Sequence, residues 1–126
     1  MSENKALITT YLRALSGRPK PPELVRAYVA DENLAAHIAA VEAAFPEYEL
    51  VIDEVLGEDD LVAVRGTFRG RHLGPFAGVE PTARLVTAGL IIIYRLKNGQ
   101  IVEHWLQMDR VALSEQLQQA PAAVAA

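Results

Sequence analysis

The residues best suited to acid–base chemistry stand together in one short segment, residues 99–109. It holds the only tryptophan of the chain (Trp105), one of its three histidines (His104) and a carboxylate (Asp109). An unperturbed imidazole has a pKa of about 6.5 and exchanges protons at neutral pH, so His104 is the first candidate for a proton carrier. The alternative is a core histidine that hydrogen-bonds a neighbouring group.

Asp109 has two interpretations. It stands directly before an apolar helical pattern that starts at Arg110, and it can cap that helix by accepting backbone N–H bonds, which would make it a poor base. Alternatively it acts as a catalytic carboxylate beside His104. In a regular strand Asp109 and Leu106 point to opposite faces, so both line one cavity only if a bulge intervenes.

The other two histidines fall on different elements. His72 opens a Gly- and Pro-rich connection, residues 70–83, and either lies at the mouth of a pocket or bonds backbone carbonyls within the loop. His37 lies beside an apolar helical stripe, as a boundary residue or as a pocket residue. The three histidines lack metal-ligand spacing, so we expect no metal site.

Arginines alternate with Thr67 along one predicted strand, at Arg65, Arg69 and Arg71. Such a row is typical of a solvated face. The functional alternative is that Arg65 alone turns inward and binds an acidic or carbonyl group of a ligand. Trp105 is most simply a packing or subunit-contact residue.

Periodicity identifies the elements that position these side chains. Helical spacing predicts a first helix capped by Ser2, a second starting at Pro22 and a third capped by Asp31. Their apolar stripes comprise Ile8, Tyr11, Leu12 and Leu15, then Leu24, Val25, Tyr28 and Val29, then Leu34, Ile38, Val41 and Phe45. From residue 48 the period becomes two, which predicts strands up to residue 109 and a last helix over 110–118. Helices followed by an antiparallel sheet indicate an α+β fold, a curved sheet with helices on one face that encloses a pocket.

The sequence around Asn98-Gly99 predicts a hairpin with a two-residue type I′ turn. Residues 90–93 are apolar at every position, so both faces of that strand are expected to be at least partly buried. A regular register pairs Lys97 with Gln100, Tyr94 with Glu103, Ile92 with Trp105 and Leu90 with Gln107 on one face, and Arg95 with Val102, Ile93 with His104 and Ile91 with Leu106 on the other. His104 then shares a face with Leu106 and Met108.

Composition limits the setting. The 126 residues fit one domain, residues 1–118, followed by an Ala-, Gln- and Pro-containing tail at 119–126 that we expect to be flexible. A net charge of -4 provides no basic footprint, so nucleic acid and anionic membranes are not expected partners. With no cysteine there is no disulfide framework and no thiol nucleophile. No apolar signal core or membrane span is evident, so a cytoplasmic location is expected.

Several short motifs together resemble the SnoaL-like polyketide cyclases of the nuclear transport factor 2-like superfamily. They are Ala-Phe-Pro at 44–46, Asp-Asp at 59–60 before 62–65, Gly-Arg-His at 70–72 with Gly-Pro-Phe-Ala-Gly at 74–78, Pro-Thr at 81–82, and Asn-Gly-Gln-Ile-Val-Glu-His-Trp at 98–105 with Asp109. The resemblance covers about residues 34–117. It implies a cone-shaped, cystatin-like α+β barrel with a hydrophobic cavity, dimerisation through the sheet, no metal or organic cofactor, and intramolecular aldol cyclisation of a polyketide ester.

The catalytic positions that this resemblance implies are not filled by catalytic residues. The acid–base aspartate of the cyclases falls on Leu106, and its histidine partner falls on Ile92. Epoxide hydrolase-like relatives use an arginine and two aspartates; this chain keeps Arg65 but has Thr67 and Leu106 at the carboxylate positions. Membership of the fold therefore supplies no mechanism by itself.

Three functions remain open: an acid–base cyclase, isomerase or dehydratase acting on a hydrophobic carbonyl compound, a binding protein for a small lipophilic molecule, and a homodimeric interaction module. The candidate catalytic residues are His104, Asp109 and His72. The residues expected to bind a ligand are Tyr11, His37, Phe45, Arg65, Phe76, Ile92, Leu106 and Met108.

Overall fold

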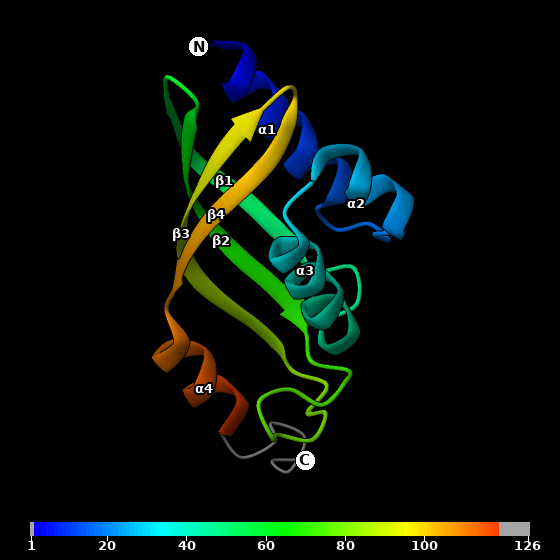
Figure 1. The fold of residues 1–126 in the computed structure, drawn as a ribbon. Coiled ribbons are helices and arrows are strands. Elements are labelled where there is room, and N and C mark those ends of the chain that lie inside the picture. Colours follow the sequence, from blue (N-terminus) through cyan, green and yellow to red (C-terminus); the bar gives the residue numbers. More distant parts are fainter. Residues whose placement is uncertain (1, 119–126) are drawn as a thin grey trace.

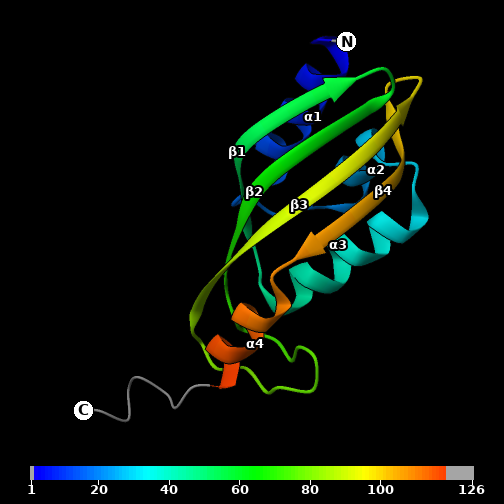
Figure 2. The ribbon, with the colours of Figure 1, turned by 90° about the vertical axis from the view of Figure 1, so that its left-hand side faces the viewer.

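The computed structural model describes residues 2–118 and has the expected α+β architecture (Figure 1). Its elements are α1 (Ser2–Leu15), α2 (Pro22–Tyr28), α3 (Glu32–Ala44), β1 (Glu49–Glu58), β2 (Leu61–Arg71), β3 (Leu85–Lys97), β4 (Gln100–Met108) and α4 (Arg110–Gln118). The four strands form one antiparallel sheet in the order β1-β2-β3-β4. Figure 2 shows α1 and α2 behind the curved sheet, α3 beside β4, and α4 at the end where β4 finishes. Two predictions lie outside what the structure describes: the cap formed by the Ser2 side chain and the flexible tail at residues 119–126.

The core lies between the inner face of the sheet and the helices. On β2 and β3 every second residue is buried, as the period of a strand requires. The helical stripes expected from the sequence face the same core, with Ile8, Tyr11, Leu12 and Leu15 on α1 and Leu34, Ile38 and Val41 on α3. The expectation for residues 90–93 is wrong in part, because Ile91 lies on the outer face and its side chain is 52% exposed. No helix among the described residues is long and apolar enough to span a membrane.

The turn at Asn98-Gly99 forms as predicted, with positive φ angles of 53° and 75° and Lys97 paired with Gln100. Beyond Ile101 the predicted register is wrong. The ladder shifts by one residue at Val102, so that Tyr94 pairs with His104. A β-bulge of this kind inserts one unpaired residue into one strand and moves all later cross-strand partners by one position.

The bulge determines which β4 side chains face the core. His104, Leu106 and Met108 share the inner face with their partners Tyr94, Ile92 and Leu90. The side chain of Trp105 points outward beside Ile93 and is 45% exposed. The predicted common face for His104, Leu106 and Met108 is confirmed, because alternation within one strand does not depend on the register of its partner.

The connection between β2 and β3 folds back against the end of α3. The backbone N–H groups of Leu73 and Gly74 both donate to the carbonyl of Ala44, at 2.9 and 3.0 Å. A Cβ atom at residue 74 would lie 2.3 Å from the carbonyl oxygen of Ala43, so this approach requires glycine. The connection thereby closes one end of the space between the sheet and α3.

Candidate functional site

Two adjoining cavities lie between the inner face of the sheet and the helices. The inner cavity has a volume of about 50 Å³ and lies among α1, α3 and all four strands. The outer cavity, of about 330 Å³, lies among α3, α4, the strands and the β2–β3 connection. Residues shared by both linings are His37, Val41, Phe68, Leu106 and Met108. The two spaces are therefore neighbours.

Three tyrosines line the inner cavity: Tyr11, Tyr48 and Tyr94. They are 2%, 5% and 1% exposed. Burial raises the pKa of all three phenols, and the proximity of the other tyrosines raises the pKa of Tyr11 further. At neutral pH each hydroxyl is therefore protonated and able to donate a hydrogen bond.

Lys20 is a further charged residue in the lining of the inner cavity, and its side chain is only 1% exposed. Its Nζ donates to the carbonyls of Arg18 and Tyr48 at 3.0 Å, lies 3.0 Å from Glu42 Oε1, and sits 4.0 Å from the centroid of the Tyr48 ring. Burial lowers the pKa of Lys20, while the hydrogen bond and charge of Glu42 oppose that change. Sequence reasoning missed Lys20, because a lysine in a Pro-rich linker carries no signal of burial.

His37, on α3, lines both cavities. Burial lowers its pKa, and the proximity of His104 and Arg110 lowers it further. The imidazole is consequently neutral at physiological pH and has a nitrogen lone pair available. Of the two alternatives from the sequence, a boundary residue or a pocket residue, the second remains a prediction for a residue that lines both cavities.

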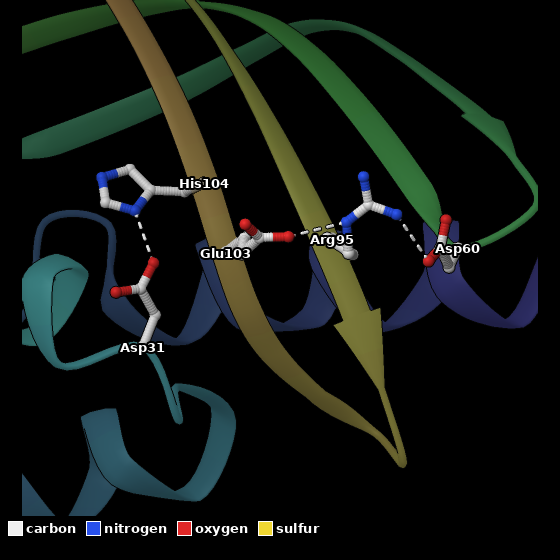
Figure 3. Close-up of polar contacts among 5 residues, drawn as sticks. All are labelled: Asp31, Asp60, Arg95, Glu103 and His104. Carbon is white, nitrogen blue, oxygen red and sulfur yellow. Dashed lines mark hydrogen bonds and ion pairs between the residues drawn. The ribbon is translucent and has the colours of Figure 1, made fainter.

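His104 forms a close pair with Asp31, the residue that precedes α3 (Figure 3). The imidazole Nδ1 donates to Asp31 Oδ2 at 2.8 Å, and the two side chains are 15% and 10% exposed. Asp31 Oδ1 also accepts from the backbone N–H groups of Asn33 and Leu34, as the predicted helix cap. Burial raises the pKa of Asp31, but the bonds from His104 and the backbone outweigh it and leave the pKa lowered. His104 lines neither cavity.

His72 is fully buried rather than at a pocket mouth, which corrects that expectation. Its ring lies 5.3 Å from that of Phe45, and its Nδ1 accepts from the backbone N–H of Thr82 at 3.2 Å. The cause is a backbone pairing in which the His72 N–H donates to Arg84 and the Ala83 N–H donates to His72, both at 2.8 Å. His72 does not line either cavity.

Two other predicted site residues also lie away from the cavities. Asp109 caps α4, where its Oδ1 accepts from the backbone N–H of Ala112 at 3.0 Å. Arg65 does not turn inward, because its neighbour Val64 faces the core and successive side chains of a strand point to opposite faces of the sheet. On the outer face its Nε donates to Glu54 Oε1 at 2.9 Å. Similar outer-face pairs join Arg95 to Glu103 and Asp60, at 2.8 and 2.9 Å (Figure 3).

Comparison with known proteins identifies the family. The model of the SnoaL-like polyketide cyclases matches residues 19–117. The chain belongs to the SnoaL-like polyketide cyclase family. No curated protein matches the sequence.

Structures of related proteins support this SnoaL-like assignment. AclR from Streptomyces galilaeus is 26% identical, with a TM-score of 0.81 over 99% of this chain and 88% of AclR. TsrD from Streptomyces laurentii is also 26% identical, with a TM-score of 0.76 over 90% of this chain and 93% of TsrD. A SnoaL-like protein from Jannaschia sp. CCS1, at 22% identity and a TM-score of 0.83 over 95% of this chain and 94% of that protein, has the same fold.

The catalytic positions implied by the SnoaL-like resemblance can now be located. Ile92 on β3 and Leu106 on β4 pair directly across the sheet, and both line the inner cavity. Both positions thus face the cavity with aliphatic side chains. Seven of the eight residues expected to bind a ligand line one or both cavities, namely Tyr11, His37, Phe45, Phe76, Ile92, Leu106 and Met108. Within residues 2–118, no three His, Asp or Glu side chains converge as metal ligands.

Proposed function

We propose that this SnoaL-like protein binds a small hydrophobic carbonyl compound of polyketide type in the two cavities and catalyses proton transfer on it. The observation that carries the proposal is the position of His37, a neutral imidazole in the lining of both cavities. A base with a pKa below ~6.5 is ready to accept a proton at neutral pH, and surrounding apolar groups strengthen its interactions with developing charge.

In the proposed reaction His37 removes a proton from the carbon beside a ligand carbonyl. The C–H electron pair becomes the enolate, and the enolate carbon attacks a second carbonyl of the same molecule to form a C–C bond. The new alkoxide then takes the proton back from the imidazolium. The product is an isomer of the substrate, so no co-reactant is required.

His104 remains the second candidate for the proton carrier. Asp31 fixes its Nδ1 as the donor, which leaves Nε2 to exchange protons. Because His104 lines neither cavity, a ligand held there would contact His37 first. The two histidines are close enough for His104 to lower the pKa of His37.

The first step can be tested without the natural substrate by using 2-acetylnaphthalene, an apolar ketone with enolisable hydrogens. Proton NMR in D2O follows exchange of its methyl hydrogens. We expect the protein to accelerate exchange, His37→Gln to abolish the acceleration, and His104→Gln to retain most of it. Equal exchange by wild type and His37→Gln would refute the role of His37.

A binding protein without catalysis is the second candidate, and the aliphatic residues Ile92 and Leu106 favour it. It predicts that 2-acetylnaphthalene raises the melting temperature through preferential binding to the native state, with no exchange above the buffer rate. Binding together with accelerated exchange would exclude this candidate.

We also propose that a second copy of the chain covers the outer face of the sheet. The exposed side chains Ile91 and Trp105 lie there, bordered by the charged pairs Arg65–Glu54 and Arg95–Glu103. An apolar centre with both signs of charge at its rim can match itself across a two-fold axis. Sedimentation equilibrium should give a dimer that Trp105→Arg converts to a monomer; a monomeric wild type at all concentrations would exclude it.

A further inference from the structure

The inner cavity contains more hydrogen-bond donors than a purely apolar pocket needs. Tyr11 comes from α1, Tyr48 precedes β1 and Tyr94 lies on β3, so three separate parts of the fold bring phenols to one space of about 50 Å³. The Tyr11 and Tyr94 rings meet edge to face, with centroids 5.9 Å apart. The remainder of the lining is mostly aliphatic.

The hydroxyls of these three tyrosines differ from those of ordinary core tyrosines in their hydrogen bonding. Within residues 2–118, no hydrogen bond joins the hydroxyl of Tyr11, Tyr48 or Tyr94 to a protein group. None of the three oxygens is among the fully enclosed side-chain atoms of these residues that lack a partner, so each hydroxyl keeps surface that a small molecule can reach. Three such donors lining one cavity indicate a site that receives its acceptor from outside the chain.

The polar groups of the lining favour an electron-rich acceptor, because the protonated phenols are hydrogen-bond donors. The Lys20 ammonium lies over the Tyr48 ring and donates to the Tyr48 carbonyl, and Glu42 Oε1 at 3.0 Å balances its charge. His37 lines the side that adjoins the outer cavity. A space of this volume accommodates a carbonyl group rather than a ring, whereas the outer cavity of about 330 Å³ has room for the apolar body of a ligand.

We propose that the hydroxyls of Tyr11, Tyr48 and Tyr94 form a subsite that donates hydrogen bonds to a carbonyl or enolate oxygen of the ligand. The ligand class is accordingly an enolisable aryl or polyenyl ketone, with its oxygen in the inner cavity and its hydrocarbon part in the outer one. This inference rests on the proposed function. It adds the group that stabilises the enolate oxygen while His37 holds the proton.

The test compares two ligands of similar shape, 2-acetylnaphthalene and 2-isopropenylnaphthalene, which has a CH2 group in place of the carbonyl oxygen. Titration calorimetry gives the ratio of their affinities for wild type and for Tyr11→Phe, Tyr48→Phe and Tyr94→Phe. Dividing one affinity by the other cancels changes in packing. We expect the preference for the ketone to fall about three- to tenfold in at least two of the three variants.

Tyr28→Phe is the matched control, because Tyr28 packs 5.6 Å from the Tyr11 ring but lines neither cavity. It should leave the ketone preference unchanged. With 2-acetylnaphthalene labelled at the carbonyl carbon, ¹³C NMR should show a downfield-shifted bound signal that moves upfield in the same variants. Thermal unfolding without ligand should be unchanged or raised in them, because each loses an unpartnered hydroxyl. A fall of several degrees would show a structural role for the hydroxyl and overturn the inference.

The outcomes separate this inference from the proposed function. If both ligands bind and the ketone preference is the same in wild type and all three phenylalanine variants, the subsite is wrong and the apolar pocket stands. If neither ligand binds, the proposed pocket fails and the subsite fails with it. Binding with a variant-sensitive preference but no hydrogen exchange supports the subsite and refutes catalysis.

Discussion

Replacing Asp31 tests how much one carboxylate contributes to the position of α3 and His104. Asp31 accepts two backbone bonds at the start of α3, at 2.9 and 3.2 Å, and one from His104 Nδ1 at 2.8 Å. Loss of a helix cap costs about 1 kcal/mol. Loss of the bond to a mostly buried imidazole adds about 1–2 kcal/mol, because the donor is left without its partner. Asp31→Ala should therefore cost about 2–3 kcal/mol.

Asp109→Ala is the matched control, because Asp109 caps α4 with one backbone bond at 3.0 Å. It should cost about 1 kcal/mol. For a chain of 126 residues, an unfolding entropy of about 2.1 cal/mol/K per residue converts these costs to decreases in melting temperature of about 8–12 °C for Asp31→Ala and about 4 °C for Asp109→Ala. Urea unfolding monitored by circular dichroism gives the free energies directly.

A double-mutant cycle isolates the contribution of the Asp31–His104 hydrogen bond to the free energy of unfolding. Asp31→Ala, His104→Gln and the double variant should show a coupling free energy of about 1–2 kcal/mol. The sign of the pH effect follows from the lowered pKa of Asp31. The carboxylate contributes its stability above its ordinary pKa of 3.8 and loses it as the pH falls through the lower folded pKa. If Asp31→Ala costs no more than Asp109→Ala at pH 7, the bond to His104 contributes nothing and this reasoning is refuted.

Three further substitutions test other parts of the structure. Because burial lowers the pKa of His37, the unfolded chain takes up a proton at a higher pH than the folded protein, and the free energy of unfolding falls from pH 7 to 5. His37→Gln should lose less of this free energy than the wild type over the same range. Equal losses in urea unfolding would contradict the prediction. Gly74→Ala should destabilise by about 1–3 kcal/mol because its Cβ meets a backbone carbonyl, whereas Gly89→Ala, with open space, should change stability by less than about 0.5 kcal/mol in urea unfolding. Lys20→Met should cost about 3 kcal/mol by leaving the Glu42 carboxylate without its cation, and adding Glu42→Leu should recover part of this cost; no recovery would mean that the pair is not coupled.

The features predicted correctly from the sequence are those determined over a few residues. Apolar positions three and four apart identify the buried side of a helix, and Asn98-Gly99 identifies a turn, because both depend on local backbone geometry. The register of β4 failed for the opposite reason. Whether Val102 is paired or bulged depends on how the whole sheet curves around α3, and Val102 itself carries no turn or glycine signal.

The sequence named two residues that line the cavities. His37 was a candidate because it lies beside an apolar helical stripe, and Leu106 because the resemblance puts the family's acid–base position there. The burial of His72 and Lys20 could not be read from their neighbours, which are Gly, Pro and Arg residues typical of loops. Both are buried by contacts with residues distant in sequence, as when the Lys20 ammonium meets the Tyr48 carbonyl and Glu42.

The aliphatic residues Ile92 and Leu106 leave another route for the proposed proton transfer, because a second element borders the same space. Leu106 on β4 and His37 on α3 line the same two cavities from facing elements, so an imidazole on the helix has access to the volume that a carboxylate at position 106 would face. A carboxylate there would become a neutral acid when it takes the proton, so it would carry no charge to attract the enolate. A neutral imidazole becomes a cation when it takes the proton, so it attracts the enolate as the enolate forms. The aliphatic side chains of Ile92 and Leu106 strengthen this attraction, because they keep water away from the pair.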